Sequence, residues 1–140
     1  MLNNCYSGFF SHLCQRIILG AMNNNYIRIQ NGTIDVCLDV LIKKDQDGVF
    51  ISYAPALDLS GCGHSLEEAK KSFETVLTEY LKYTIQNGTL EKDLLEHKWK
   101  KVDNTFASPA FWVIFRTNKE AQRMYAGDFS KSQERMTIAC

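Results

Sequence analysis

The sequence lacks the cysteine pattern of a disulfide-stapled or zinc-binding protein. Its 140 residues include five cysteines, an odd number, and no C-x-x-C pair. The cysteines are widely spread: Cys5, Cys14, Cys37, Cys62 and Cys140. Unpaired, scattered cysteines fit a reducing compartment, so we expect a cytoplasmic protein.

The sequence also lacks net charge and a long apolar run. It has 16 Lys and Arg against 16 Asp and Glu, so no global basic field attracts nucleic acid or anionic lipid. The apolar stretch from Phe9 to Met22 is interrupted by His12, Gln15 and Arg16 and is shorter than the roughly 20 residues that span a bilayer. It also has no basic leader. We predict no signal peptide and no membrane anchor, and one domain with one core.

Residues 1–22 are set apart from the patterned chain as an N-terminal extension. Met22 is followed by three consecutive asparagines, a polar run that interrupts regular structure. Two interpretations stand side by side. In one, Met22 is the natural start; in the other, a short amphipathic helix from about Ser11 to Ala21 packs on the body.

The segment from Tyr26 to Tyr53 has a strong β pattern. Tyr26 to Gln30 is β-prone and is followed by the turn-forming pair Asn31-Gly32. Five apolar residues then alternate on one strand face: Ile34, Val36, Leu38, Val40 and Ile42. Asp35, Cys37, Asp39, Leu41 and Lys43 fall on the other face. The sequence therefore predicts a half-buried strand with a polar side.

Turn chemistry follows this strand. Asp45 and Asp47 can accept hydrogen bonds from nearby backbone N–H groups, and Gly48 can adopt the left-handed conformation of a hairpin bend. The next strand is expected from Val49 to Ala54, ending at Pro55, which cannot donate to a ladder. A third, short strand is expected near residues 61–63.

A strongly amphipathic helix is expected from residue 65 to 87. Ser65 and Glu68 form a capping box, in which the serine hydroxyl accepts from the Glu68 N–H and the Glu68 carboxylate reaches back to the Ser65 N–H. Apolar residues recur at spacings of three and four: Leu66, Ala69, Phe73, Val76, Leu77, Tyr80 and Leu81. Asn87-Gly88 ends the helix with residues that a left-handed cap favours. Thr89 then starts a second helix to about His97.

Residues 103–140 form an irregular extension that we connect with dimerisation. The run Ala110–Phe115 is apolar, β-branched and aromatic, which predicts a buried strand. Asn118 to Tyr125 is expected to be a helix with Ala121 and Met124 on its apolar face, and Met136 to Ala139 a further strand.

The order of these central motifs resembles the HicB family of antitoxins. The matching pieces lie within residues 34–86: Asp45, Asp47 and Gly48; Pro55, Ala56 and Leu57; Gly61, Cys62 and Gly63; Ser65, Glu67, Glu68 and Ala69. The resemblance implies an α+β fold, a small antiparallel sheet of three to four strands with the main helix on one face, similar to a degenerate RNase H or double-stranded-RNA-binding arrangement. That domain would occupy residues 23–102.

The resemblance also implies a non-catalytic function: a HicB-like protein binds and neutralises a HicA-type toxin, a small basic mRNA-cleaving RNase. The residues expected to meet such a partner are Asp35, Asp39, Asp45, Asp47 and Tyr53. An exposed sheet edge further predicts a homo-oligomer, here a homodimer. The family often carries a C-terminal DNA-binding motif, but the basic residues after Trp99 show no helix-turn-helix spacing, which speaks against direct operator binding.

Other chemistry is weaker in the sequence. Asp35 and Asp39 are separated by about 13 Å of strand, too far for a two-metal nuclease site. The continuation after Gly48 does not supply calcium ligands. Cys62 and His64 precede a helix and form the one nucleophile candidate, although no third orienting residue can be named. We therefore expect no catalytic, metal or cofactor site; a stand-alone module that binds RNA or a small ligand is the alternative function.

Overall fold

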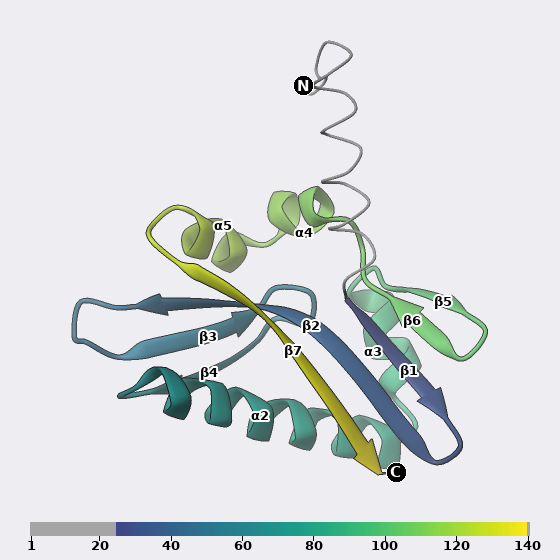
Figure 1. Cartoon of the computed structure of the whole chain (residues 1–140). Helices are drawn as coiled ribbons and strands as arrows, with labels where there is room; N and C mark the ends of the chain where they lie inside the picture. The colour runs from purple at the N-terminus through teal and green to yellow at the C-terminus, as the bar shows by residue number, and fades with distance from the viewer. Residues whose placement is uncertain (1–24, 140) are drawn as a thin grey trace, which may run out of the picture.

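The computed structural model describes residues 25–139, and one long strand organises them. Strand β2 (Thr33–Lys44) pairs with β7 (Ser130–Ala139) along one edge. Its other edge is shared, because residues 33–37 pair with β1 (Tyr26–Gln30) and residues 41–44 pair with β3 (Phe50–Ala54). The sheet therefore forks along this edge, and two branches diverge from one central strand (Figure 1).

A side chain fills the fork. The Oδ1 atom of Asn25 accepts a hydrogen bond from the backbone N–H of Asp39 at 2.5 Å, and Asn25 is 7% exposed. This N–H lies between the residues that β1 and β3 pair with, so no strand on that edge serves it. The asparagine thus satisfies a backbone donor that would otherwise be orphaned inside the protein.

Short strands extend both branches. β4 (Leu59–Gly63) pairs with β3, β6 (Thr105–Ala107) pairs with β1, and β5 (Lys100–Val102) pairs with β6. The sheet has seven antiparallel strands among the described residues, where three to four were expected. Two of them, β6 and β7, lie after residue 103, so this region adds strands to the sheet and is not an irregular extension.

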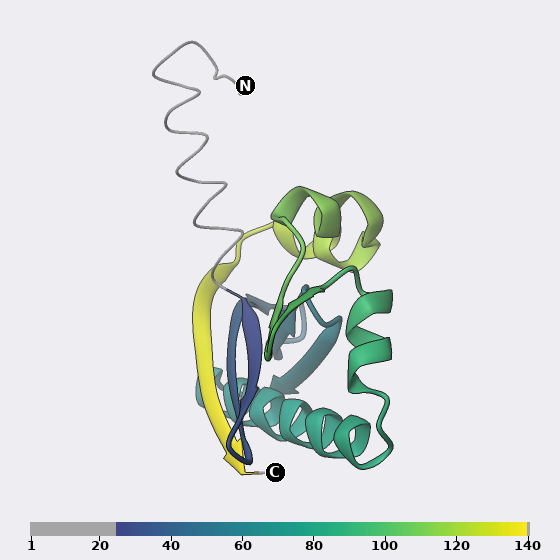
Figure 2. The ribbon, with the colours of Figure 1, turned by 90° about the vertical axis from the view of Figure 1, so that its right-hand side faces the viewer.

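Helix α2 (Leu66–Gln86) covers one face of the sheet, as its apolar stripe predicts (Figure 2). Its buried residues Phe73, Leu77 and Leu81 belong to the same core cluster as the even-numbered apolar residues of β2. Ser65 caps the helix by accepting from the Glu68 N–H at 3.1 Å. The reciprocal bond differs from the expected one, because the Glu68 carboxylate accepts from the N–H of His64, at 3.0 Å, instead of that of Ser65.

A short helix and a tryptophan complete this core. Helix α3 (Leu90–Glu96) follows Gly88, whose φ of +66° is the left-handed conformation expected at that position. Trp99 is 2% exposed, and its indole N–H donates to the carbonyl oxygen of Ala56 at 2.7 Å. Trp99 is therefore a core residue with a satisfied polar group.

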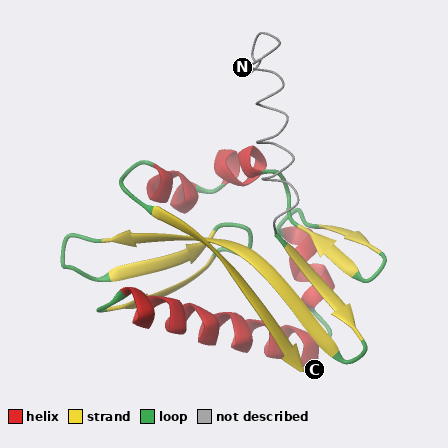
Figure 3. Cartoon of the chain, viewed as in Figure 1, coloured by secondary structure: helices red, strands yellow, loops and turns green. Residues whose placement is uncertain are grey.

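Residues 111–115 are helical and Ala110 is the N-cap, so the strand predicted for Ala110–Phe115 from its composition is wrong (Figure 3). Helix α4 (Phe111–Thr117) leads into α5 (Lys119–Tyr125), whose expected range and buried Ala121 and Met124 are confirmed. A short apolar run fits either conformation by composition alone. The helix brings Phe111 and Phe115, four residues apart, both against the ring of Tyr125.

Figure 1 shows α2 on one side of the sheet and the pair α4–α5 on the other. Ala121 and Met124 of α5 pack on Leu41 and Tyr53, at the end of the sheet nearest the β2–β3 turn. None of the helices within residues 25–139 is long and apolar enough to cross a membrane. Both interpretations of residues 1–22 concern residues outside the described range.

Candidate partner-binding face

The face of the sheet opposite α2, called here the open face, carries the odd-numbered side chains of β2. The predicted alternation is confirmed, since Ile34, Val36 and Leu38 are in the core between the sheet and α2. Helix α5 covers the open face above Leu41. The remaining part carries Asp35, Cys37 and Asp39.

Strand β7 supplies partners for both aspartates of β2. Thr137 donates its hydroxyl hydrogen to Oδ1 of Asp35 at 2.9 Å. Asp39 forms an ion pair with Lys131, 3.3 Å between Oδ2 and Nζ, and accepts from the Gln133 amide at 3.5 Å. These cross-strand contacts offset the acidic character that the sequence predicts for this face.

Cys37 lies between the two aspartates and opposite Arg135 of β7. It is 1% exposed, and burial raises the pKa of its thiol, while the nearby Arg135 guanidinium acts in the opposite direction. A buried thiol with a raised pKa stays protonated at neutral pH and behaves as a small apolar side chain.

Asp45 and Asp47 lie at the β2–β3 turn and have different roles. Oδ1 of Asp45 accepts from the backbone N–H groups of Asp47 and Val49, both at 2.9 Å, and Gly48 has a φ of +81°. The predicted turn role of Asp45 is therefore confirmed. The Asp47 side chain is exposed and makes none of the described side-chain hydrogen bonds or ion pairs, so its carboxylate is available to a partner.

Tyr53 does not lie on an accessible part of this face. It is 3% exposed beneath α5, donates its hydroxyl hydrogen to Asp58 Oδ1 at 2.6 Å and accepts from the Asn118 amide at 2.7 Å. Burial, together with the Asp58 bond, raises the pKa of its phenol. Asn118, the N-cap residue of the covering helix α5, lies 65 residues after Tyr53 in the sequence. No local sequence pattern could therefore predict this burial.

The outer edge of β7 offers unpaired backbone groups. Odd-numbered residues of β2 direct their backbone groups toward β1 and β3, as the bond between Asp39 and Asn25 shows. Backbone N–H and C=O groups point alternately to the two edges of a strand. The backbone groups of the even-numbered residues of β2 and of their β7 partners therefore point toward each other. The backbone groups of Lys131, Gln133, Arg135 and Thr137 consequently face outward, where no strand of residues 25–139 pairs with them.

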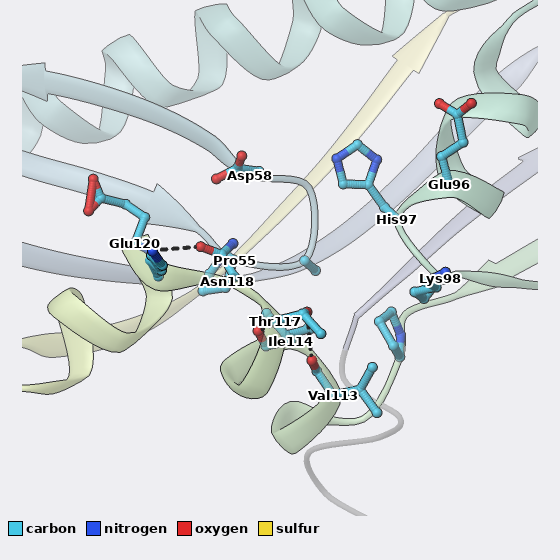
Figure 4. A pocket seen from close by; sticks show the side chains of 13 residues that line it. Pro55, Asp58, Glu96, His97, Lys98, Val113, Ile114, Thr117, Asn118 and Glu120 are labelled. Atoms are coloured by element: carbon cyan, nitrogen blue, oxygen red, sulfur yellow. Dashed lines mark hydrogen bonds between the residues drawn. The ribbon is translucent and has the colours of Figure 1, made fainter.

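A hollow of about 490 Å³ lies between the β3–β4 loop, the end of α3 and the α4–α5 pair. Asp58, His97, Lys98 and Glu120 line it from three separate segments (Figure 4). The mixture of acidic and basic groups could hold a small polar ligand. The sequence gives no signal for this hollow, because tertiary packing alone brings these segments together.

The G-C-G motif has a structural explanation. A Cβ atom on Gly61 would lie 2.5 Å from the backbone nitrogen of Phe73, and one on Gly63 would lie 2.7 Å from that of Ala69. Glycine lets β4 approach the backbone of α2 this closely. Cys62 between them is exposed, and no hydrogen bond joins it to His64 among those described.

Among residues 25–139, no group of three or more His, Cys, Asp and Glu residues is placed to hold a metal ion. No protein-family model, curated protein or solved structure matches this chain.

Proposed function

We propose that the chain is a HicB-like antitoxin, or an orphan relative, that binds and neutralises a HicA-type mRNA-cleaving toxin without catalysing a reaction itself. The observation that carries this proposal is the β2–β3–β4–α2 unit, in which three of the four motifs of the resemblance have a local role. Asp45 and Gly48 make the turn, Gly61 and Gly63 admit the helix backbone, and Ser65 caps α2.

The proposed contact surface combines the part of the open face that α5 leaves uncovered with the β2–β3 turn. Asp35 and Asp39 contribute carboxylates that exchange their β7 partners for groups on the toxin, and Asp47 contributes a carboxylate that is already available. Asp45 supports this surface through the turn. We leave Tyr53 out, because its buried hydroxyl is bonded on both sides.

Charge reversal at the turn tests the surface. The probe is a basic protein of fewer than about 100 residues, encoded next to this gene and expressed with and without this chain. When the basic protein is expressed without this chain, we expect it to arrest growth and cleave mRNA. When the two are expressed together, we expect it to be inactive. Asp47→Lys should slow association with the basic partner, most at low salt.

Glu79→Lys is the matched control. Glu79 is exposed on α2, on the other side of the sheet, and the substitution changes net charge by the same amount. Equal association rates for the two variants would remove the turn from the contact surface. A neighbour that is harmless, or whose toxicity this chain leaves unchanged, would refute the antitoxin proposal itself.

We also propose that two copies pair through the free edges of β7. Proline at 133 would remove an outward N–H group while leaving the ladder with β2 intact, because Gln133 directs its backbone away from β2. Gln133→Pro should therefore shift the chain from dimer to monomer in sedimentation, whereas Gln133→Ala, which loses the same side chain, should not. Identical masses for both variants would exclude this interface.

The alternative is a stand-alone module that binds RNA or a small ligand, and the hollow beside His97 and Lys98 is the observation that favours it. Salt-dependent RNA binding by the purified chain, weakened by His97→Ala with Lys98→Ala, would support this function. Unchanged binding in the double variant would remove the hollow from it.

A further inference from the structure

Helices α4 and α5 and the loop that follows α5 carry an exposed aromatic patch, defined here as Phe111, Trp112, Phe115, Tyr125 and Phe129. Four of these residues are exposed by 36 to 43% of their surface, namely Phe111, Trp112, Phe115 and Phe129. The rings of Phe111, Phe115 and Phe129 each contact the ring of Tyr125, with centroid distances between 4.9 and 5.9 Å. Soluble proteins rarely leave a contiguous aromatic group uncovered, so this patch calls for an occupant.

Helix α4 itself is incomplete as a packed element. Five of its seven residues are apolar, and none is buried by the described chain. A helix this short is marginal in water unless tertiary packing supports one of its faces. Within residues 25–139, its main support is the contact of Ile114 with the core and of the two phenylalanines with Tyr125.

The described chain begins beside this patch. The carbonyl oxygen of Asn25 accepts from the N–H of Ser108 at 3.2 Å, three residues before α4 starts. Asn25 also lines a small hollow together with Phe111, Ile114 and Tyr125. The chain that precedes Asn25 is thus tethered next to the aromatic patch, and the three residues 22–24 span at most about 11 Å.

The preceding sequence has a matching apolar stripe. Placed on a helical wheel, seven residues occupy one half of the circumference: Phe9, Phe10, Leu13, Cys14, Ile17, Ile18 and Ala21. Ser11, His12, Gln15 and Arg16 fall on the other half, together with one apolar residue, Leu19. A helix over residues 9–21 would be about 20 Å long, enough to lie along a seven-residue helix and its neighbour.

We propose that residues 9–21 form an amphipathic helix that docks its apolar stripe on the aromatic patch of the same molecule. The tether favours this occupant over a second copy, because a short linker gives the segment an effective concentration in the millimolar range. The docked segment covers the four exposed rings and supplies the packing that α4 lacks.

Photo-crosslinking tests the contact directly in the full chain. Benzoylphenylalanine in place of Phe115 keeps an aromatic side chain in the patch, and mass spectrometry identifies what it captures. We expect most of the product to be an intramolecular crosslink to residues 9–21, in a yield that does not change with protein concentration. Crosslinks to a second chain, or to other peptides of the same chain, overturn the proposal.

Paired substitutions test the stripe. Leu13→Asp with Ile17→Asp places two charges on the apolar half of the wheel, while Ser11→Asp with Gln15→Asp places them on the polar half. The first pair should raise the emission of the dye ANS severalfold by exposing the patch, and the second pair should leave it unchanged. Equal dye emission for the two pairs overturns the proposal.

Removal of residues 1–21 should raise dye emission as much as the stripe variant. The shortened chain begins at Met22 and keeps every described residue. Unchanged emission in the shortened chain would mean that the segment does not cover the patch. The fluorescence of the buried Trp99 reports whether the shortened chain folds. If it does not fold, the crosslink in the full chain decides whether residues 9–21 contact the patch.

Discussion

Gly61→Ala is the substitution whose effect follows most directly from the structure. The added Cβ atom would lie 2.5 Å from the Phe73 nitrogen, 2.8 Å from its Cα and 2.9 Å from the Ser72 carbonyl carbon. All three are backbone atoms of α2, so no side-chain rotation relieves the clash. Ordinary contact begins at 3.4 Å, so strand β4 and the helix must separate by about 0.9 Å.

The cost can be worked from what crosses this interface. Forcing an extra carbon atom into a packed interior costs about 1–3 kcal/mol. The separation also weakens two hydrogen bonds between sheet and helix, from the Ser52 hydroxyl to the Ala69 carbonyl at 2.7 Å and from the Cys62 N–H to the Ser72 hydroxyl at 3.2 Å. Each contributes about 1 kcal/mol, so we expect the free energy of unfolding to fall by about 2–4 kcal/mol.

Urea unfolding followed by circular dichroism measures this loss, with two other glycines as controls. At Gly127 an added Cβ would meet only the end of the Lys43 side chain, at 2.7 Å, which can move away, so Gly127→Ala should change stability by less than about 0.5 kcal/mol. Gly88 has a φ of +66° and open space around it, so Gly88→Ala should cost about 1 kcal/mol, from backbone strain alone. A loss for Gly61→Ala no larger than that for Gly127→Ala would refute the close-packing explanation.

Three further predictions concern stability. Ser65→Ala removes the cap of α2 and should lower the free energy of unfolding by about 1 kcal/mol in urea melts, whereas Ser65→Asp should retain most of it. Trp99→Phe leaves the Ala56 carbonyl unpaired beside a cavity and should cost about 2–4 kcal/mol; a loss below about 1 kcal/mol would mean that this bond contributes little. Burial and the Asp93 carboxylate raise the pKa of Tyr80 above the ordinary tyrosine value of about 10, so the folded chain keeps a proton that the unfolded chain releases. The free energy of unfolding should therefore fall above about pH 10, by up to about 1.4 kcal/mol per pH unit, and Tyr80→Phe should reduce this slope.

Local signals were sufficient where one residue type has one physical role. The period-2 alternation of β2 placed Ile34, Val36 and Leu38 in the core, and the Ser65 cap located the start of α2. The Asp45 and Gly48 turn and the helix ending at Gly88 were predicted for the same reason. In each case the signal lies within a few residues, so a short stretch of the sequence is enough to predict the structure.

Long-range partners were beyond such signals. Strand β7 was expected only over its last four residues, because Ser130 to Arg135 is polar and gains strand structure by pairing with β2 almost a hundred residues earlier. The predicted acidic face lost part of its charge for the same reason, since Lys131 of β7 forms an ion pair with Asp39. Tyr53 was placed on a surface that α5 covers.

The sequence by itself determined the hairpin of β2 and β3, its turn at Gly48 and the helix α2. Backbone conformation and side-chain periodicity in these segments are set within a few residues. Tertiary structure alone decided that β2 lies inside a seven-stranded forked sheet and that Phe111–Phe115 is part of a helix. It also decided that both aspartates of β2 have partners. These features depend on which distant segments meet, and that choice is made by the packing of the whole chain, which no single segment encodes.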